Sequence, residues 1–201
     1  MKKQTHDLGV FSPSEVLDKY LDRERLDRYF SVLMDHNSRI NLVSRETSRE
    51  DFDRLVAESL LPLDQIKEPF TSYLDIGSGG GFPSLPILLS GIVSEGAILV
   101  ERTEKKARAL KSMLNELGLK GRVVPRNLDE VKDLPKFPFI TLRLVKLDQT
   151  LLTRIYGLLQ PGGILAYYSR PEFPVADYAC QTYIYRSSQG VEPKSFTLFQ
   201  K

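Results

Sequence analysis

Residues 74–83, LDIGSGGGFP, carry the strongest local signal in this 201-residue chain. Four glycines and a serine follow a strand-like run and precede an apolar run with the character of a helix. Glycines after a strand let the backbone turn tightly, approach a ligand closely and enter a helix whose N–H groups point outward. The stretch therefore predicts a nucleotide or nucleoside site at the end of a strand.

Three kinds of ligand compete for a loop of this type. A triphosphate loop needs a lysine followed by Ser or Thr, and the following residues, GFPSLP, supply none. A dinucleotide loop needs a third glycine at position 82, where this chain has Phe82. A turn with a purely structural role is a further alternative. The remaining pattern resembles motif I of the S-adenosylmethionine (SAM)-dependent methyltransferases, on Asp75, Gly77, Gly79 and Gly81.

Two carboxylates stand where such a cofactor needs them. SAM carries an ammonium group, and Asp75 at the end of its strand can polarise a cationic pocket directly or through water. The next strand, AILVE, ends at Glu101, where a carboxylate can hold both ribose hydroxyls. Nicotinamide folds use the same device, so Glu101 alone does not distinguish a SAM site from a nicotinamide site. A charge on the surface is a further alternative for this residue. Both residues end strands, where open α/β sheets bind ligands.

The order of elements along the chain indicates an α/β fold. Residues 12–66 have helical spacing, with Ser12 and Glu15 forming a predicted capping box and a second helix start at residues 47–51, TSRED. From residue 72, strands alternate with helices, which implies a parallel sheet covered on both faces. The runs QTYIYRS and KSFTLFQ then predict a terminal antiparallel hairpin.

We therefore expect a Rossmann-like class I methyltransferase fold. Its sheet has seven strands and ends in the antiparallel hairpin. An N-terminal helical extension, residues 1–70, packs on a SAM-binding core, residues 71–201.

Composition adds limits without naming a substrate. A net charge of +2 permits nucleic-acid binding but does not argue for it. The single cysteine, Cys180, allows no internal disulfide, which suits a reducing cytoplasm. The first residues have no secretory apolar region, and the longest apolar run is too short to span a bilayer. We expect a cytoplasmic protein with no membrane partner, and no metal, because no His/Cys cluster has ligand spacing.

A longer match points to one family. The string YLDIGSGGGFPSLPILL resembles the motif of the glucose-inhibited division protein B family, small-subunit ribosomal RNA guanine-N7 methyltransferases. The distinctive part is GFPSLP after the glycines. Glu58-Ser59 resembles the Asp-Ser pair that ends a family helix, and the likeness runs from about residue 29 to the C-terminus. Weaker likenesses lie in the segments INLVSRE, VERTEKKARAL, RNLDEV and FITLRLVKL.

The resemblance implies SAM as cofactor and ribosomal RNA of the small subunit, as 16S RNA, as substrate. It implies that Arg143, at the end of the fourth strand, faces the active site and that Asn41 lines the same cleft. An exposed arginine is the alternative for Arg143. The implied cofactor contacts are Gly77, Phe82 and, largely through backbone groups, Leu128 and Asp129.

Methylation at guanine N7 needs no general base, because N7 carries a lone pair and no proton. Catalysis would then come mostly from positioning. As a hypothesis, Arg143 and Arg170 hold phosphate or the guanine carbonyl oxygen. Arg45 and Arg49 either bind the RNA backbone or are solvated loop charges. We expect the protein to act as a monomer.

Three positions depart from the family, which has basic residues where this chain has Leu55, Asn127 and Ser169. These departures keep two alternatives open: a methyltransferase acting on a small molecule or protein, and a non-catalytic cofactor-binding module. A nicotinamide oxidoreductase is a third alternative, and Phe82 argues against it.

Overall fold

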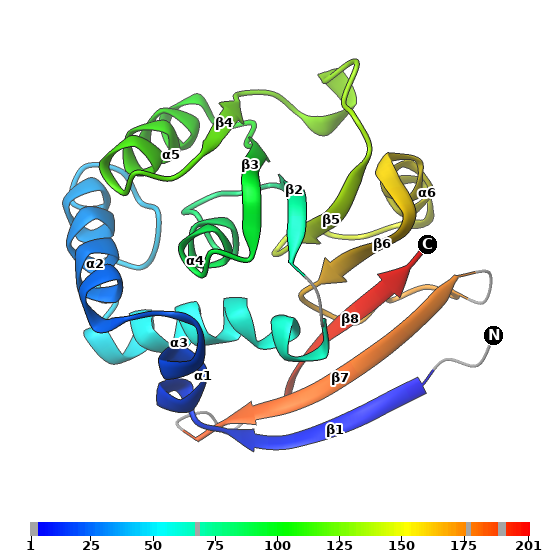
Figure 1. Ribbon diagram of the computed structural model, residues 1–201, viewed down its shortest axis with the longest axis horizontal. Coiled ribbons are helices and arrows are strands. Elements are labelled where there is room, and N and C mark those ends of the chain that lie inside the picture. The colour runs from blue at the N-terminus through cyan, green and yellow to red at the C-terminus, as the bar shows by residue number, and fades with distance from the viewer. Residues whose placement is uncertain (1–3, 67–68, 176–177, 189–191) are drawn as a thin grey trace.

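The computed structural model describes residues 4–66, 69–175, 178–188 and 192–201, and its centre is one eight-stranded sheet (Figure 1). The strand order is β1-β7-β8-β6-β5-β2-β3-β4. The strands are β1 (Gln4–Phe11), β2 (Phe70–Ile76), β3 (Val93–Val100), β4 (Gly121–Val124), β5 (Phe137–Leu142), β6 (Leu159–Tyr167), β7 (Ala179–Ser187) and β8 (Lys194–Gln200).

The five strands from β2 to β6 pair in parallel, whereas β8 runs antiparallel to both β6 and β7. Parallel neighbours need crossover connections, which the helices between them supply. The α/β class and the terminal antiparallel pair are therefore confirmed. The turn expected at residues 188–193 has its centre, residues 189–191, outside the described residues.

The sheet has one strand more than the seven expected, and the N-terminal segment is not all helical. The extra strand is β1, which pairs in parallel with β7 and covers an edge that would otherwise be open. Phe11 packs edge-to-face on Tyr185, with ring centroids 5.4 Å apart. The sequence of β1 gives no strand signal, because Asp7 and Gly9 interrupt the alternation of polar and apolar residues. Gly9 has φ +71, and the register shifts between Asp7 and Val10.

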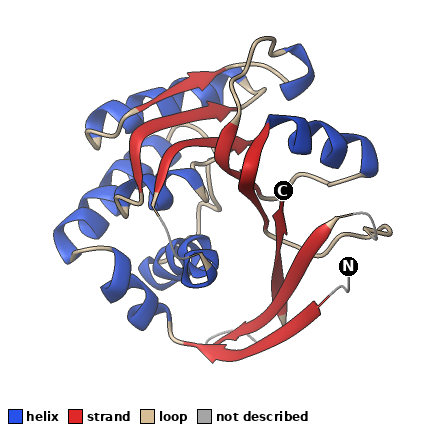
Figure 2. Ribbon diagram, turned by 45° about the vertical axis from the view of Figure 1, so that its right-hand side comes forward, coloured by secondary structure: helices blue, strands red, loops and turns tan. Residues whose placement is uncertain are grey.

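Helices cover both faces of the sheet (Figure 2). The α-helices are α1 (Pro13–Tyr20), α2 (Arg23–Asn37), α3 (Arg49–Leu60), α4 (Ser84–Leu89), α5 (Glu104–Glu116) and α6 (Gln149–Leu158). Two 3₁₀ helices are η1 (Leu61–Gln65) and η2 (Leu128–Glu130). No helix in these ranges has the length and apolar character needed to cross a membrane.

Alternation along the central strands divides the core into two apolar clusters, because successive strand residues point to opposite faces. On β2, Tyr73 joins the cluster that packs under α1 to α5. Its neighbour Leu74 joins the cluster under α6, with Leu152 and Ile155. The N-terminal helices therefore share a continuous core with the parallel sheet.

The two predicted helix starts differ in the structure. At α3, the Ser48 hydroxyl accepts from the backbone N–H of Asp51 at 3.0 Å, and the Asp51 carboxylate accepts from the N–H of Ser48 at 3.3 Å. This is a complete capping box. At α1, Ser12 makes no capping bond and its hydroxyl pairs with that of Ser14 at 2.8 Å. The capping box expected from Ser12 and Glu15 is therefore wrong, whereas α1 itself begins at Pro13 as expected.

We expect Ser48→Ala to lower the free energy of unfolding by about 1 kcal/mol, because a helix N-terminal N–H loses its acceptor. Ser12→Ala is the matched control and should change it by less than about 0.5 kcal/mol. Urea unfolding followed by circular dichroism measures both. Equal losses for the two variants would contradict the assignment of the caps.

Candidate active site

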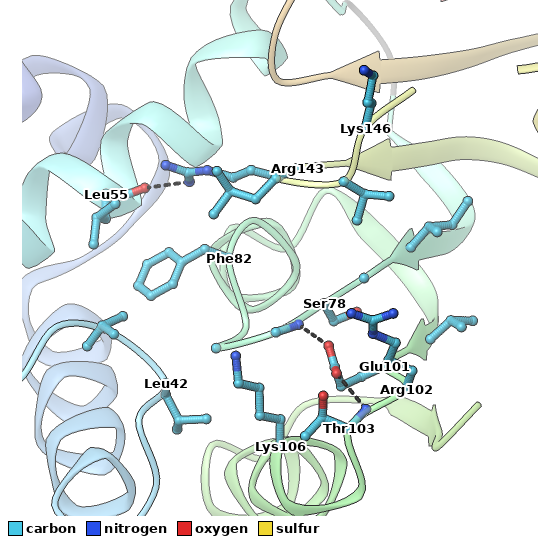
Figure 3. Close-up of a pocket in the computed structure, with 18 of the residues that line it drawn as sticks. Leu42, Leu55, Ser78, Phe82, Glu101, Arg102, Thr103, Lys106, Arg143 and Lys146 are labelled. Carbon is cyan, nitrogen blue, oxygen red and sulfur yellow. Dashed lines mark hydrogen bonds between the residues drawn. The ribbon is translucent and has the colours of Figure 1, made fainter. Parts of the chain in front are cut away.

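A cavity of about 1020 Å³ opens at the carboxyl ends of β2, β3 and β5. The glycine loop after β2 lines the cavity, together with a wall from the segment after β5 and a wall from residues 42–47 with part of α3. Carboxyl ends of parallel strands are where open α/β sheets bind ligands. The cavity is therefore the first candidate for the site (Figure 3).

The glycine loop is packed so closely that three of its four glycines, Gly77, Gly80 and Gly81, leave no room for a side chain. A Cβ on Gly80 would lie 2.4 Å from the carbonyl oxygen of Leu42, and one on Gly77 would lie 2.5 Å from Cγ2 of Val145. Gly77 and Gly79 also have φ values of +75 and +50, which favour glycine. Gly77, Gly79 and Gly80 nevertheless line the cavity and are only partly buried, so backbone without side chains faces it there.

Glu101 follows β3 and ties the glycine loop to the start of α5 (Figure 3). Its Oε2 accepts from the backbone N–H of Gly79 at 2.8 Å, and Oε1 accepts from that of Thr103 at 2.7 Å. The side chain is buried yet lines the cavity. A carboxylate with two donors already aligned keeps lone pairs for hydroxyl groups of a ligand.

Asp75 lies beneath the loop in a buried polar network and is not part of the cavity lining. Its Oδ1 accepts from the hydroxyl of Thr141 at 2.6 Å, and the Thr141 hydroxyl also pairs with that of Tyr73 at 2.5 Å. Oδ2 is buried with no hydrogen-bond partner among the described residues. Burial raises the pKa of the Asp75 carboxyl above its ordinary value, and the Thr141 hydroxyl opposes this only in part.

Leu128 and Asp129 begin η2 and line the cavity on the side of β4. The guanidinium of Arg154 fixes both, since it pairs with the Asp129 carboxylate and donates to the Leu128 carbonyl oxygen. The Leu128 side chain is buried in the core. Arg154 of α6 therefore joins this part of the cavity lining to the helix.

Arg143 follows β5 and is held in the cavity wall by α3. Its Nη1 donates to the hydroxyl of Ser59 at 2.8 Å and to the carbonyl oxygen of Leu55 at 3.5 Å. Its Nη2 donates to Oε2 of Glu58 at 3.2 Å. The ring of Tyr168 packs against the guanidinium at 5.6 Å. Glu58-Ser59, the pair that resembles a family motif, therefore fixes the arginine.

The family follows from comparison with known proteins. The family model GidB, rRNA small subunit methyltransferase G, matches residues 22–199. The chain belongs to this family. A ribosomal RNA small subunit methyltransferase G of Wolinella succinogenes is 34% identical over 145 residues, covering 72% of this chain and 74% of that protein. One of Borrelia hermsii is 34% identical over 167 residues, covering 80% and 75%.

Solved structures of other methyltransferases share the fold of this GidB member. An O-methyltransferase from Bacillus cereus in complex with SAH superposes with a TM-score of 0.65 at 17% identity, covering 94% of this chain and 96% of that one. The 16S rRNA N2 G1207 methyltransferase of T. Thermophilus, in complex with AdoMet and guanosine, gives 0.55 at 18% identity, covering 73% and 43%. The SAM-dependent methyltransferase fold expected from the sequence is confirmed.

The cavity brings together most of the site residues expected for a GidB protein. Phe82 lines the cavity, and its ring also packs on Tyr29 and Phe52, with centroids 5.8 and 6.3 Å apart. It therefore fastens the glycine loop to α2 and α3. The expected residues in the lining are Gly77, Gly79, Phe82, Glu101, Leu128, Asp129 and Arg143.

Other expected residues lie outside the cavity lining. Gly81 has φ +92, and a Cβ there would meet the Leu85 side chain at 2.6 Å, so packing explains this glycine. Asn41 and Arg45 are exposed and bond to each other, Nε to Oδ1, at 3.1 Å. Arg170 is exposed beyond β6.

Arg49 connects two helices and does not line the cavity. It forms ion pairs with Asp27 at 2.6 Å and with Asp53 at 2.8 Å, and its guanidinium lies 5.1 Å from the ring centroid of Phe30. These contacts join α2 to α3.

Two further residues that shape the cavity were not predicted from the sequence. Asn37, buried at the end of α2 behind the lining, accepts from the N–H groups of Leu42 and Val43 at 2.9 and 3.0 Å and so shapes the wall. Lys106 extends from α5 toward the glycine loop (Figure 3), and the family's Lys-Arg pattern after the acidic residue could have signalled it. Within the described ranges, no three His, Cys, Asp or Glu side chains group as metal ligands would.

The raised pKa of Asp75 predicts a pH-dependent stability. Between the ordinary value, 3.8, and the raised value, the folded protein keeps a proton that the unfolded chain has lost, so the free energy of unfolding falls as pH rises. Asp75→Asn removes this loss. We expect the Tm difference, variant minus wild type, to increase from about pH 4 to about pH 8 in scanning calorimetry. A difference that shrinks over this range would contradict the assignment.

Proposed function

We propose that this protein transfers the methyl group of SAM to N7 of a guanine in small-subunit ribosomal RNA. The observation that supports this best is that a bare glycine loop and the fixed Arg143 face one cavity in a chain of the GidB family. The part of the cavity at the glycine loop suits the cofactor, and the part at Arg143 suits an electron-rich acceptor.

The residues fit SAM on three counts. Gly77, Gly79 and Gly80 line the cavity and are only partly buried, so their backbone groups can meet a ligand. The buried Oδ2 of Asp75 lacks a partner among the described residues, and a cation bound above the loop would favour the ionised form of this carboxyl, which burial alone disfavours. Glu101 at the strand end can accept from ribose hydroxyls, as such carboxylates do in related folds.

When bound, SAM supplies a methyl group on sulfonium sulfur, which guanine N7 takes with its lone pair while the bond electrons stay on sulfur. Because N7 has no proton to lose, the chain has only to bind and orient. Neither His6 nor His36 lines the cavity, and the Nε2 of His36 pairs with Glu116 at 2.8 Å. Arg143 can donate to O6, the acceptor next to N7.

The charge of the cavity favours a nucleic-acid substrate over a neutral small molecule. Leu55 and Asn127 line the cavity at positions where the family has basic residues. Six basic side chains nevertheless face it against four acidic ones, and phosphate contacts dominate RNA affinity. The basic residues are Arg54, Arg102, Lys106, Arg126, Arg143 and Lys146.

We expect Glu101→Gln to raise the Kd for SAM about tenfold or more, because one of the two N–H donors would then face an amide NH₂ and a charge-assisted contact is lost. Glu104→Gln is the matched control, since that carboxylate is exposed and lies outside the cavity lining. Isothermal calorimetry with SAM measures both. Full affinity in the Glu101 variant would remove Glu101 from the cofactor site.

Incubation of small ribosomal subunits that lack the modification with the protein and labelled SAM tests the substrate. Nucleoside mass spectrometry of the recovered 16S RNA should show 7-methylguanosine only when the protein is present. Label that appears in protein or in a small molecule, with none in RNA, would favour another substrate class. Tight SAM binding with no transfer to any of them would favour a non-catalytic module.

A further inference from the structure

Leu144, next to Arg143, is the most exposed large apolar side chain in the described part of the chain. It is 99% exposed, and Val10, at 66%, is the other large apolar residue that is exposed there. Leu144 also lines the cavity. Its φ is +59, in the left-handed region that bulky residues rarely adopt.

The two neighbours of Leu144 hold it in this position. Arg143 is fixed on one side by Ser59 and Glu58. On the other side, Val145 packs over the glycine loop, with Cγ2 where a side chain on Gly77 would have to stand. With both neighbours anchored inward, the backbone turns Leu144 away from the core.

The positive φ of Leu144 lowers the stability of the folded protein, and packing of the exposed side chain does not offset this. A non-glycine residue in the left-handed region carries strain, and strain of this kind clusters at sites of function. A fully exposed leucine also gains nothing from burial in the free protein. A contact made with substrate would account for both features.

We infer that Leu144 packs against the ring of the acceptor guanine as the base enters the cavity, an inference that rests on the proposed function. A base must leave its stack to reach an enclosed site, and its ring face then needs a new apolar or aromatic neighbour. Leu144 supplies that neighbour at the cavity edge, one residue from the guanidinium that can bond the base edge. Leu144 would thus contact the ring face of the base, and Arg143 would bond to the edge of the same base.

Three variants of Leu144 test this: Leu144→Ala, Leu144→Gly and Leu144→Met. Val10→Ala is the control, an exposed apolar residue on β1 outside the cavity lining. For each, steady-state methylation of unmodified small ribosomal subunits gives kcat and KM for the subunit. Calorimetry gives the Kd for SAM, and thermal unfolding gives Tm.

We expect Leu144→Ala and Leu144→Gly to lower kcat/KM for the subunit about tenfold, with the Kd for SAM unchanged. The Tm of Leu144→Gly should equal or exceed that of wild type, because glycine adopts the positive φ without strain. Leu144→Met and Val10→Ala should retain wild-type kcat/KM.

Wild-type kcat/KM in both truncated variants would overturn the inference, as would a loss that follows weaker SAM binding or a lower Tm. Failure of the wild-type protein itself to methylate the subunit would instead overturn the proposed function, and this inference with it.

Discussion

The buried carboxylate of Glu58 is the constraint on which the arrangement of the site depends. Only 2% of the residue is exposed, and a charge so deeply buried is costly unless paired. Arg143 pairs with one oxygen at 3.2 Å and Lys194 of β8 with the other at 2.6 Å. Ser59 and Tyr168 extend the network, since the Tyr168 hydroxyl donates to the Ser59 carbonyl oxygen. Helix α3, the end of β5 and the terminal strand are thereby fixed together, and the arginine faces the cavity.

A second constraint is steric and comes from the glycine loop. Leu42 of the N-terminal wall and Val145 of the β5 wall both lie where side chains on the loop would stand. The glycines therefore let three segments converge as well as leaving backbone for a cofactor. This explains why the N-terminal helices belong to the site: Phe82 fastens the loop to Tyr29 and Phe52, and Asn37 shapes the segment that carries Leu42.

Sequence predicted those features whose signals are local. The loop, Glu101 after β3 and the β7–β8 pair each follow from a few adjacent residues. Strand β1 could not be predicted in this way. Its register with β7 joins residues as distant as Gln4 and Gln181, and Gly9 breaks the alternation of its own side chains. The ion pair between Glu58 and Arg143, which are 85 residues apart, could not be predicted either, although both residues lie in segments that resemble the family. Burial, which decides whether Asp75 faces a ligand or lies beneath it, is likewise set by distant packing.

We expect Glu58 to act on methyl transfer through Arg143. A double-mutant cycle on the single-turnover rate with unmodified small subunits measures this coupling, using Glu58→Gln, Arg143→Met and the double variant. Calorimetry with SAM confirms that each variant is folded. We expect the double variant to be no slower than Arg143→Met alone, because the other partner of Glu58, Lys194, lies outside the cavity lining and Glu58 reaches the cavity only through Arg143. Losses that multiply would contradict it, since the two residues would then act independently.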